Sequence, residues 1–216
     1  MIRKKEQKID QIVSTITTKI SKINERYRKG PGLYFYNRIF ELRQNCNGVQ
    51  SFLSNDYNVE ILYATLVSWD MNTRGAKMKY FDDFKENILS CIRLFNSIDE
   101  YERNRNYNAA NLASILRHVY ENLHVMKTNA KLVSNSKILH FLFPNLCMPM
   151  DGKNTLTFFY GNTGESENKF VQIVHLTFEI MTLDMDFNQY IDDGWNKTIP
   201  KMIDNAIILL VGDSVN

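Results

Sequence analysis

The sequence predicts an all-α protein, a single compact multi-helix domain, on three observations. Apolar residues recur at three- and four-residue steps along most of the 216 residues, which is the period of a helix that buries one face. No alternating strand pattern is longer than a few residues, and only residues 57–63 and 156–160 are ambiguous. Hydrophobic residues make up 44% and charged residues 23%, which excludes a disordered chain, a collagen and a coiled-coil rod.

The first expected element is a basic amphipathic helix within residues 1–30, packed on the body of the protein. Apolar residues recur through it, and Gly30-Pro31-Gly32 is a strong helix breaker. The segment carries nine Lys and Arg against three Asp and Glu. The cations Lys19, Lys22 and Arg26 fall off the apolar stripe, so this face either meets DNA phosphates or is simply solvated.

Residues 31–216 are expected to form the all-α helical domain itself. Its apolar stripes predict helices over residues 34–44, 59–67, 84–95, 112–126, 170–181 and 199–210. The polar segment 99–108 is expected to be a connection between two of them. The last 52 residues carry three Lys and Arg against nine Asp and Glu, an acidic end that would repel phosphate or attract the basic arm.

Composition also limits location and cofactors. The longest apolar run, Ala206 to Val211, is far shorter than the roughly 20 residues that span a bilayer. No apolar stretch follows the basic start, so we expect no secretory signal, no membrane partner and a cytoplasmic location. The three cysteines suit a reducing compartment. The four histidines lack a metal-binding spacing, so we expect neither a metal nor any other cofactor.

Residues 134–161 carry the most specific pattern. Ser134 or Asn135 is placed to cap a short helix with Lys137 in its first turn, and Pro144 ends that helix. Pro149-Met150-Asp151 then leads into another helix, with Asp151 at the N-cap position.

This arrangement resembles the helix-hairpin-helix DNA glycosylase superfamily. Lys137 and the Pro149-Met150-Asp151 segment match its elements in order, and Gly161 lies near a glycine that the family often has. The resemblance covers about 28 of the 216 residues. The same stretch is also similar to a short Ser-Lys…Leu-His…Pro…Asp segment found in prokaryotic proteins.

The resemblance implies a fold of orthogonal helices and a specific site. Lys137 would be the nucleophile and Asp151 the activating carboxylate. A hairpin formed by Ser134, Asn135 and Ser136 would contact the DNA backbone, although it lacks the glycines of the family hairpin. The family's iron–sulfur cysteines are absent, since no cysteine follows residue 147.

The chemistry of such a pair is well defined. A lysine amine can attack the sugar carbon and form a Schiff base, and a nearby aspartate can stabilise the developing cation. An extruded base needs aromatic partners, for which the loop candidates are Tyr34, Phe35, Tyr36 and Trp69. On the simpler interpretation, Asp151 is only a helix cap and Lys137 an ordinary surface lysine.

Three functions follow from these alternatives. The first is a DNA-associated enzyme of the glycosylase kind. The second is a non-catalytic DNA-binding module that uses the basic arm. The third is a helical protein–protein interaction or homo-oligomerisation module that docks through the first helix.

Overall fold

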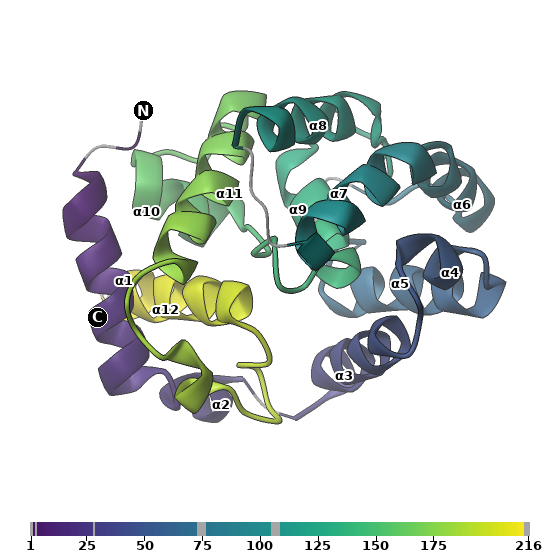
Figure 1. Cartoon of the computed structure of the whole chain (residues 1–216). Helices are drawn as coiled ribbons and strands as arrows, with labels where there is room; N and C mark the ends of the chain where they lie inside the picture. The colour runs from purple at the N-terminus through teal and green to yellow at the C-terminus, as the bar shows by residue number, and fades with distance from the viewer. Residues whose placement is uncertain (1, 3, 28, 73–76, 105–108, 214–216) are drawn as a thin grey trace. The chain divides into compact units, whose positions relative to one another are not determined.

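All regular secondary structure in the described part of the chain is helical. A computed structural model describes residues 2, 4–27, 29–72, 77–104 and 109–213. These residues form twelve α-helices, one π-helical turn and one 3-10 helix, with a single isolated bridge between Met78 and Met126 (Figure 1). The all-α prediction is therefore confirmed, and both ambiguous runs are helical.

The chain divides into two compact units. Unit 1 combines Met1–Arg28 with Pro144–Asn216, and unit 2 is Lys29–Phe143. The chain thus enters unit 2 beside the predicted breaker at Gly30 and returns to unit 1 at Pro144.

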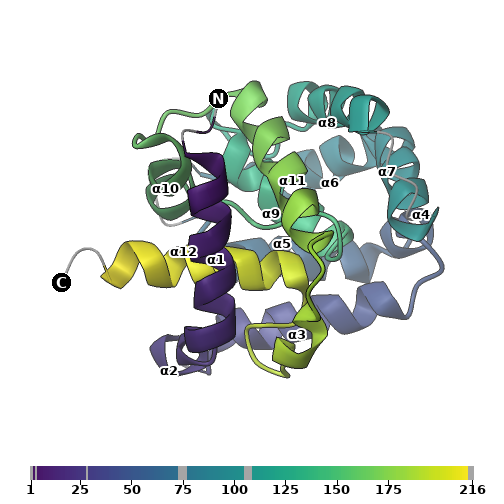
Figure 2. The ribbon, with the colours of Figure 1, turned by 60° about the vertical axis from the view of Figure 1, so that its left-hand side comes forward.

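Unit 1 is built around its last helix. Its elements are α1 (Lys5–Lys19), α2 (Lys22–Arg26), η1 (Gly152–Leu156), α10 (Thr157–Tyr160), α11 (Glu167–Met181), η2 (Phe187–Tyr190) and α12 (Ile199–Asp213). Helix α12 packs against α1, η1 and α11, and Figure 2 shows α1 crossing α12. Ile12 and Ile16 of α1 are fully buried, so the apolar stripe of the basic arm is covered within unit 1.

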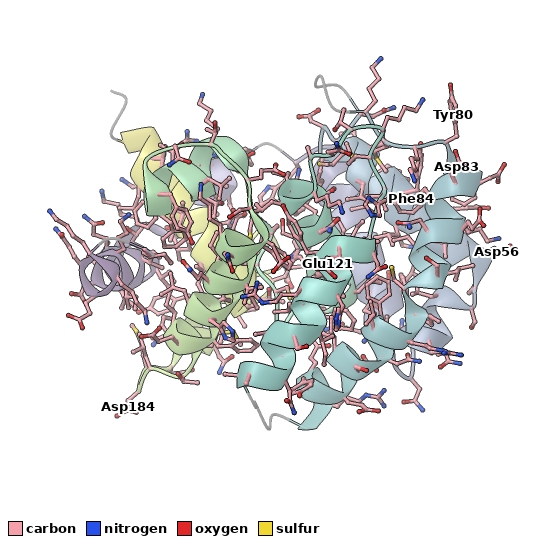
Figure 3. The ribbon with its side chains drawn as sticks, turned by 90° about the horizontal axis from the view of Figure 1, so that it is seen from above. Asp56, Tyr80, Asp83, Phe84, Glu121 and Asp184 are labelled. Atoms are coloured by element: carbon pink, nitrogen blue, oxygen red, sulfur yellow. The ribbon has the colours of Figure 1, made fainter. Side chains whose placement is uncertain are left out.

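Unit 2 is a cluster of seven described helices. They are α3 (Pro31–Gln44), α4 (Val49–Leu53), α5 (Asp56–Ser68), α6 (Phe81–Ser90), α7 (Ile92–Asn104), α8 (Ala109–Asn122) and α9 (Leu132–Leu142). Helix α3 packs on α5, and α9 contacts α3, α5 and α8. Figure 3 shows Phe84 of α6 among the helices, where it is fully buried, whereas Tyr80 projects outward. Pro31 lies in the first turn of α3, where the fixed φ of proline already matches the helical backbone.

The predicted connection at residues 99–108 is wrong for its first part. Residues 99–104 continue α7, while residues 105–108 lie outside the described part of the chain. Asp99 is buried because cations compensate its charge: it pairs with Arg43 and Arg103 and accepts a hydrogen bond from the main-chain nitrogen of Val49 at 3.3 Å. Arg43 also donates from Nε to the carbonyl of Leu142 at 2.7 Å. Because the charge of Asp99 is paired, this polar end of α7 can be helical and face the interior of unit 2.

Across the described residues, no helix combines the length and the apolar character that a membrane crossing requires.

Candidate functional site

Helix α9 begins earlier than the sequence suggests. It starts at Leu132 with Lys131 at the N-cap, and the main-chain nitrogen of Asn135 already donates to the Lys131 carbonyl at 2.8 Å. Lys137 therefore lies in the second turn, and its predicted place in the first turn is wrong. The reason is that Leu132 is fully buried and anchors an extra turn ahead of the polar residues.

The expected hairpin at Ser134, Asn135 and Ser136 is also wrong. All three residues lie inside α9 and are buried, with exposures of 3%, 0% and 0%. The two serine hydroxyls donate to carbonyls of their own helix, those of Lys131 at 3.1 Å and Val133 at 2.9 Å. Side chains buried and satisfied in this way do not present polar groups to a DNA phosphate.

Lys137 is half-buried and tied to the end of α5. Its Nζ donates to the carbonyl of Trp69 at 3.0 Å and lies 3.4 Å from Sδ of Met71. The same nitrogen is 5.7 Å from the centroid of the Trp69 ring. The Trp69 carbonyl, the Met71 sulfur and the Trp69 ring thus help to position the amine.

Two of the aromatic residues expected to stack on a base are packed in unit 2 instead. Tyr36 is 1% exposed, and its hydroxyl lies 3.0 Å from Nε2 of the buried His140. Trp69 packs edge-on against Phe141, with ring centroids 4.8 Å apart, and donates from Nε1 to the Gly32 carbonyl at 3.1 Å. The prediction that Tyr36 lies in an open loop is wrong, because it belongs to the buried face of α3.

The other two aromatic candidates, Tyr34 and Phe35, lie on α3, in the helix that the sequence predicts over residues 34–44, and not in a loop. Tyr34 is 66% exposed, and its ring lies edge-on to Phe35 with centroids 5.3 Å apart. Tyr34 therefore keeps an accessible ring, although its helix gives it a fixed position.

Asp151 caps the element that follows it, as the sequence predicts. Its Oδ1 accepts hydrogen bonds from the main-chain nitrogen of Asn154 at 2.9 Å and from the Asn154 amide at 3.3 Å. In return, its own main-chain nitrogen donates to the Thr155 hydroxyl at 3.0 Å. This reciprocal cap starts η1, which continues into α10, and leaves the carboxylate half-buried.

The Asp151 carboxylate acts on the end of the basic arm. Burial raises the pKa of Tyr27, the negative charges of Asp204 and Asp151 raise it further, and Arg26 lowers it. Lys22 and Arg26 of α2 are exposed, as is Lys19 of α1.

Lys137 belongs to unit 2 and Asp151 to unit 1. The basic residues Lys19, Lys22 and Arg26 therefore share a unit with the carboxylate and not with the amine.

The sequence did not lead us to predict a buried polar network that lies in unit 1. Lys201 is 4% exposed and donates from Nζ to Oδ2 of Asp204 at 2.7 Å and to Oδ1 of Asn205 at 2.6 Å. Asn205 donates in turn to Oδ1 of Asn196 at 2.8 Å. The only local signal for it is the Asp-Gly-Trp-Asn turn at residues 193–196, which precedes Thr198 at the start of α12.

No group of three or more His, Cys, Asp or Glu side chains in the described residues could hold a metal ion. Comparisons with protein-family models, with curated proteins and with solved structures found no match for this chain.

Proposed function

We propose that the protein associates with DNA through the basic face of unit 1, and that Lys137 and Asp151 give it base-excision chemistry. The observation that supports the proposal is local to unit 1. Lys22 and Arg26 of α2 are exposed, and in the same unit the cap formed by Asp151 holds a half-buried carboxylate in a fixed position. A cationic surface and an ordered carboxylate in one unit suit a strand whose phosphates are bound while a sugar reacts.

The excision step has a simple balance. The Lys137 ammonium first gives a proton to the solvent, and the free amine attacks C1′ of a deoxyribose. The C1′–N bond to the base breaks, and the base leaves with the bonding electrons and takes up a proton from the solvent. The C1′–O4′ bond then breaks as a proton moves from Nζ to O4′, which opens the sugar ring and leaves a protonated imine between C1′ and Nζ. The Asp151 carboxylate would stabilise the positive charge that develops on the sugar as the bond breaks.

Binding to a DNA duplex over a series of salt concentrations tests the association. Each phosphate contact adds about 0.9 to the slope of log affinity against log salt. A triple variant with Lys19→Gln, Lys22→Gln and Arg26→Gln should therefore reduce the slope by up to about 2.7 and weaken binding regardless of sequence.

The matched control removes the same charge from exposed positions of unit 2, with Lys77→Gln, Arg93→Gln and Lys127→Gln. This variant should keep the wild-type slope. Equal losses in the two variants, or an unchanged slope in the first, would mean that the arm is not the DNA contact.

The competing function, docking of a partner or a second copy through the first helix, is disfavoured by burial. Ile12 and Ile16 of α1 are 0% exposed because the helix packs on α12. An apolar stripe already covered within unit 1 is not available as a docking face.

The proposal keeps the cytoplasmic location expected from the sequence. Cys46, Cys91 and Cys147 are free thiols, and the last two are buried. Burial raises the pKa of the Cys91 thiol against the opposing effect of a hydrogen bond between its sulfur and the Ser90 hydroxyl. A thiol with a raised pKa is a poor nucleophile, so Cys91 suits a structural role, and free thiols suit a reducing compartment.

A further inference from the structure

Two aromatic side chains from distant parts of the sequence meet in unit 1. The rings of Tyr27, after α2, and Trp195, before α12, have centroids 5.6 Å apart and planes inclined at 53°. Tyr27 is 38% exposed, and Trp195 is half-buried. The pair therefore presents aromatic surface to the solvent.

The main chain of Trp195 is clamped from two helices. Its nitrogen donates to Oδ1 of Asn24 in α2 at 2.9 Å, and its carbonyl accepts from Nδ2 of Asn205 in α12 at 2.9 Å. Both main-chain groups of a loop residue are thus bound by side chains, which fixes its position more firmly than one turn could.

The clamp residues are themselves held. Asn24 donates from Nδ2 to Oδ2 of Asp192 at 2.7 Å, and Asn205 accepts from Nζ of the buried Lys201 at 2.6 Å. The Lys201 nitrogen also lies 5.8 Å from the centroid of the Trp195 ring. Most of this network therefore converges on Trp195 and sets where its indole lies.

Two exposed cations precede Tyr27 on α2. Arg26 is adjacent to Tyr27 in the sequence, with its guanidinium against Gly212 of α12, and Lys22 lies one turn earlier. Aromatic faces flanked by Lys and Arg are the combination that binds single-stranded nucleic acid, through stacking of the bases and neutralisation of the phosphates.

We infer that Tyr27 and Trp195 form a platform on which an unpaired base of a nucleic-acid strand stacks, with Arg26 and Lys22 on its phosphates. The inference rests on the proposed function and adds the class of ligand, a strand with an unpaired or extruded base. It also replaces the aromatic residues expected from the sequence with two that the fold brings together.

Tryptophan fluorescence can observe the platform directly. The chain has two tryptophans, Trp69 and Trp195, so a Trp69→Phe variant reports on Trp195 alone. An unstructured single-stranded oligodeoxynucleotide should quench the emission of this variant. Inorganic polyphosphate, which carries the charge without the bases, should bind without comparable quenching. A Trp195→Phe variant, which keeps Trp69, should show no quenching.

Affinity gives an independent measure. Removing one stacking ring costs a factor of about 5 to 150 in affinity for a single strand. We expect a loss in that range for Trp195→Ala and for Tyr27→Ala, whose exposed side chain can be removed without emptying the core. Tyr80→Ala is the control, because Tyr80 is 73% exposed on unit 2 (Figure 3) and should leave the affinity unchanged.

Equal quenching by polyphosphate and by the oligonucleotide would overturn the platform, as would wild-type affinity in both ring variants. If duplex binding still depends on Lys19, Lys22 and Arg26 in that case, only the platform fails. Loss of that dependence as well would overturn the proposed function itself.

Discussion

The Oδ1 atom of Asn24 lies 2.9 Å from the main-chain nitrogen of Trp195, so one side chain of α2 fixes a loop 171 residues away in the sequence. The space around this contact is closed. A Cβ atom added at Gly194 would lie 2.3 Å from the same oxygen, so a side chain there would displace the Asn24 amide from this contact. The contact joins the two sequence segments of unit 1 at the place where we propose that a base stacks.

Replacing Asn24 with Ala should destabilise unit 1 by about 1–3 kcal/mol, because two hydrogen bonds of roughly 1 kcal/mol are lost and their partners are left to find others. Urea denaturation measures this change. The exposed Asn188 of η2 provides the control, and Asn188→Ala should change the free energy of unfolding by less than about 0.5 kcal/mol. Equal effects in both variants would show that the clamp adds nothing.

The capping role of Asp151 and its proposed role in base release can be tested separately. Asn is as good an N-cap as Asp, so Asp151→Asn should keep the stability, whereas Asp151→Ala should lose about 1 kcal/mol. Both variants remove the carboxylate and should abolish base release on damaged DNA. Asp186→Asn is the matched control, since Asp186 caps η2 through a hydrogen bond from Asn188 at 3.0 Å. Full base release by Asp151→Asn would reduce Asp151 to a cap.

Asp99 should be among the most sensitive positions of unit 2. Asp99→Ala leaves the buried Arg43 without its main counter-charge, which costs about 3–5 kcal/mol. Thermal or urea unfolding checks the loss. In the surface pair of half-buried Lys85 and exposed Asp56, 2.8 Å apart, Asp56→Ala should cost less than about 1 kcal/mol. A small effect at both positions would contradict the buried-charge account.

The stability of unit 1 should fall in acid partly because of Asp192. Burial raises the pKa of this carboxyl, but hydrogen bonds from Asn196, Asn24 and Gly194 outweigh burial, and the net effect lowers the pKa. A lowered pKa in the folded state gives stability that is complete above the unfolded value of about 3.9 and is lost as the pH falls through the folded value. Between pH 5 and pH 2, the wild type should therefore lose more stability than Asp192→Asn. If the free energies of unfolding of the wild type and of Asp192→Asn fell in parallel with pH, Asp192 would not contribute to the loss of stability in acid.

The helices were predictable from periodicity because burial sets the apolar spacing. Leu112, Leu116 and Val119 are all fully buried on α8, as their stripe requires. The start of α9 was not predictable, because Ser134 and Ser136 read as capping residues although their hydroxyls bond back to the helix. Local sequence does not distinguish these two uses of a serine.

The candidate site was predictable only in part. The cap formed by Asp151 is local and was predicted correctly. The clamp on Trp195 depends on Asn24 and Asn205, and the burial of Lys201 depends on Asp204. Contacts of Asn24 and Trp195 across so much sequence leave no periodic signal, so only the fold reveals them.

Reductive trapping on DNA that contains an abasic site shows whether Lys137 is the nucleophile. The amine and the sugar aldehyde form an imine with loss of water, and borohydride reduces the imine to a stable link. Lys131 is a close control: its Nζ donates to the Glu121 carbonyl at 2.9 Å and lies 5.9 Å from the Tyr120 ring, and burial lowers its pKa. We expect a covalent adduct for the wild type and for Lys131→Gln, and none for Lys137→Gln. No adduct with the wild type, or an undiminished adduct with Lys137→Gln, would rule out Lys137 as the nucleophile.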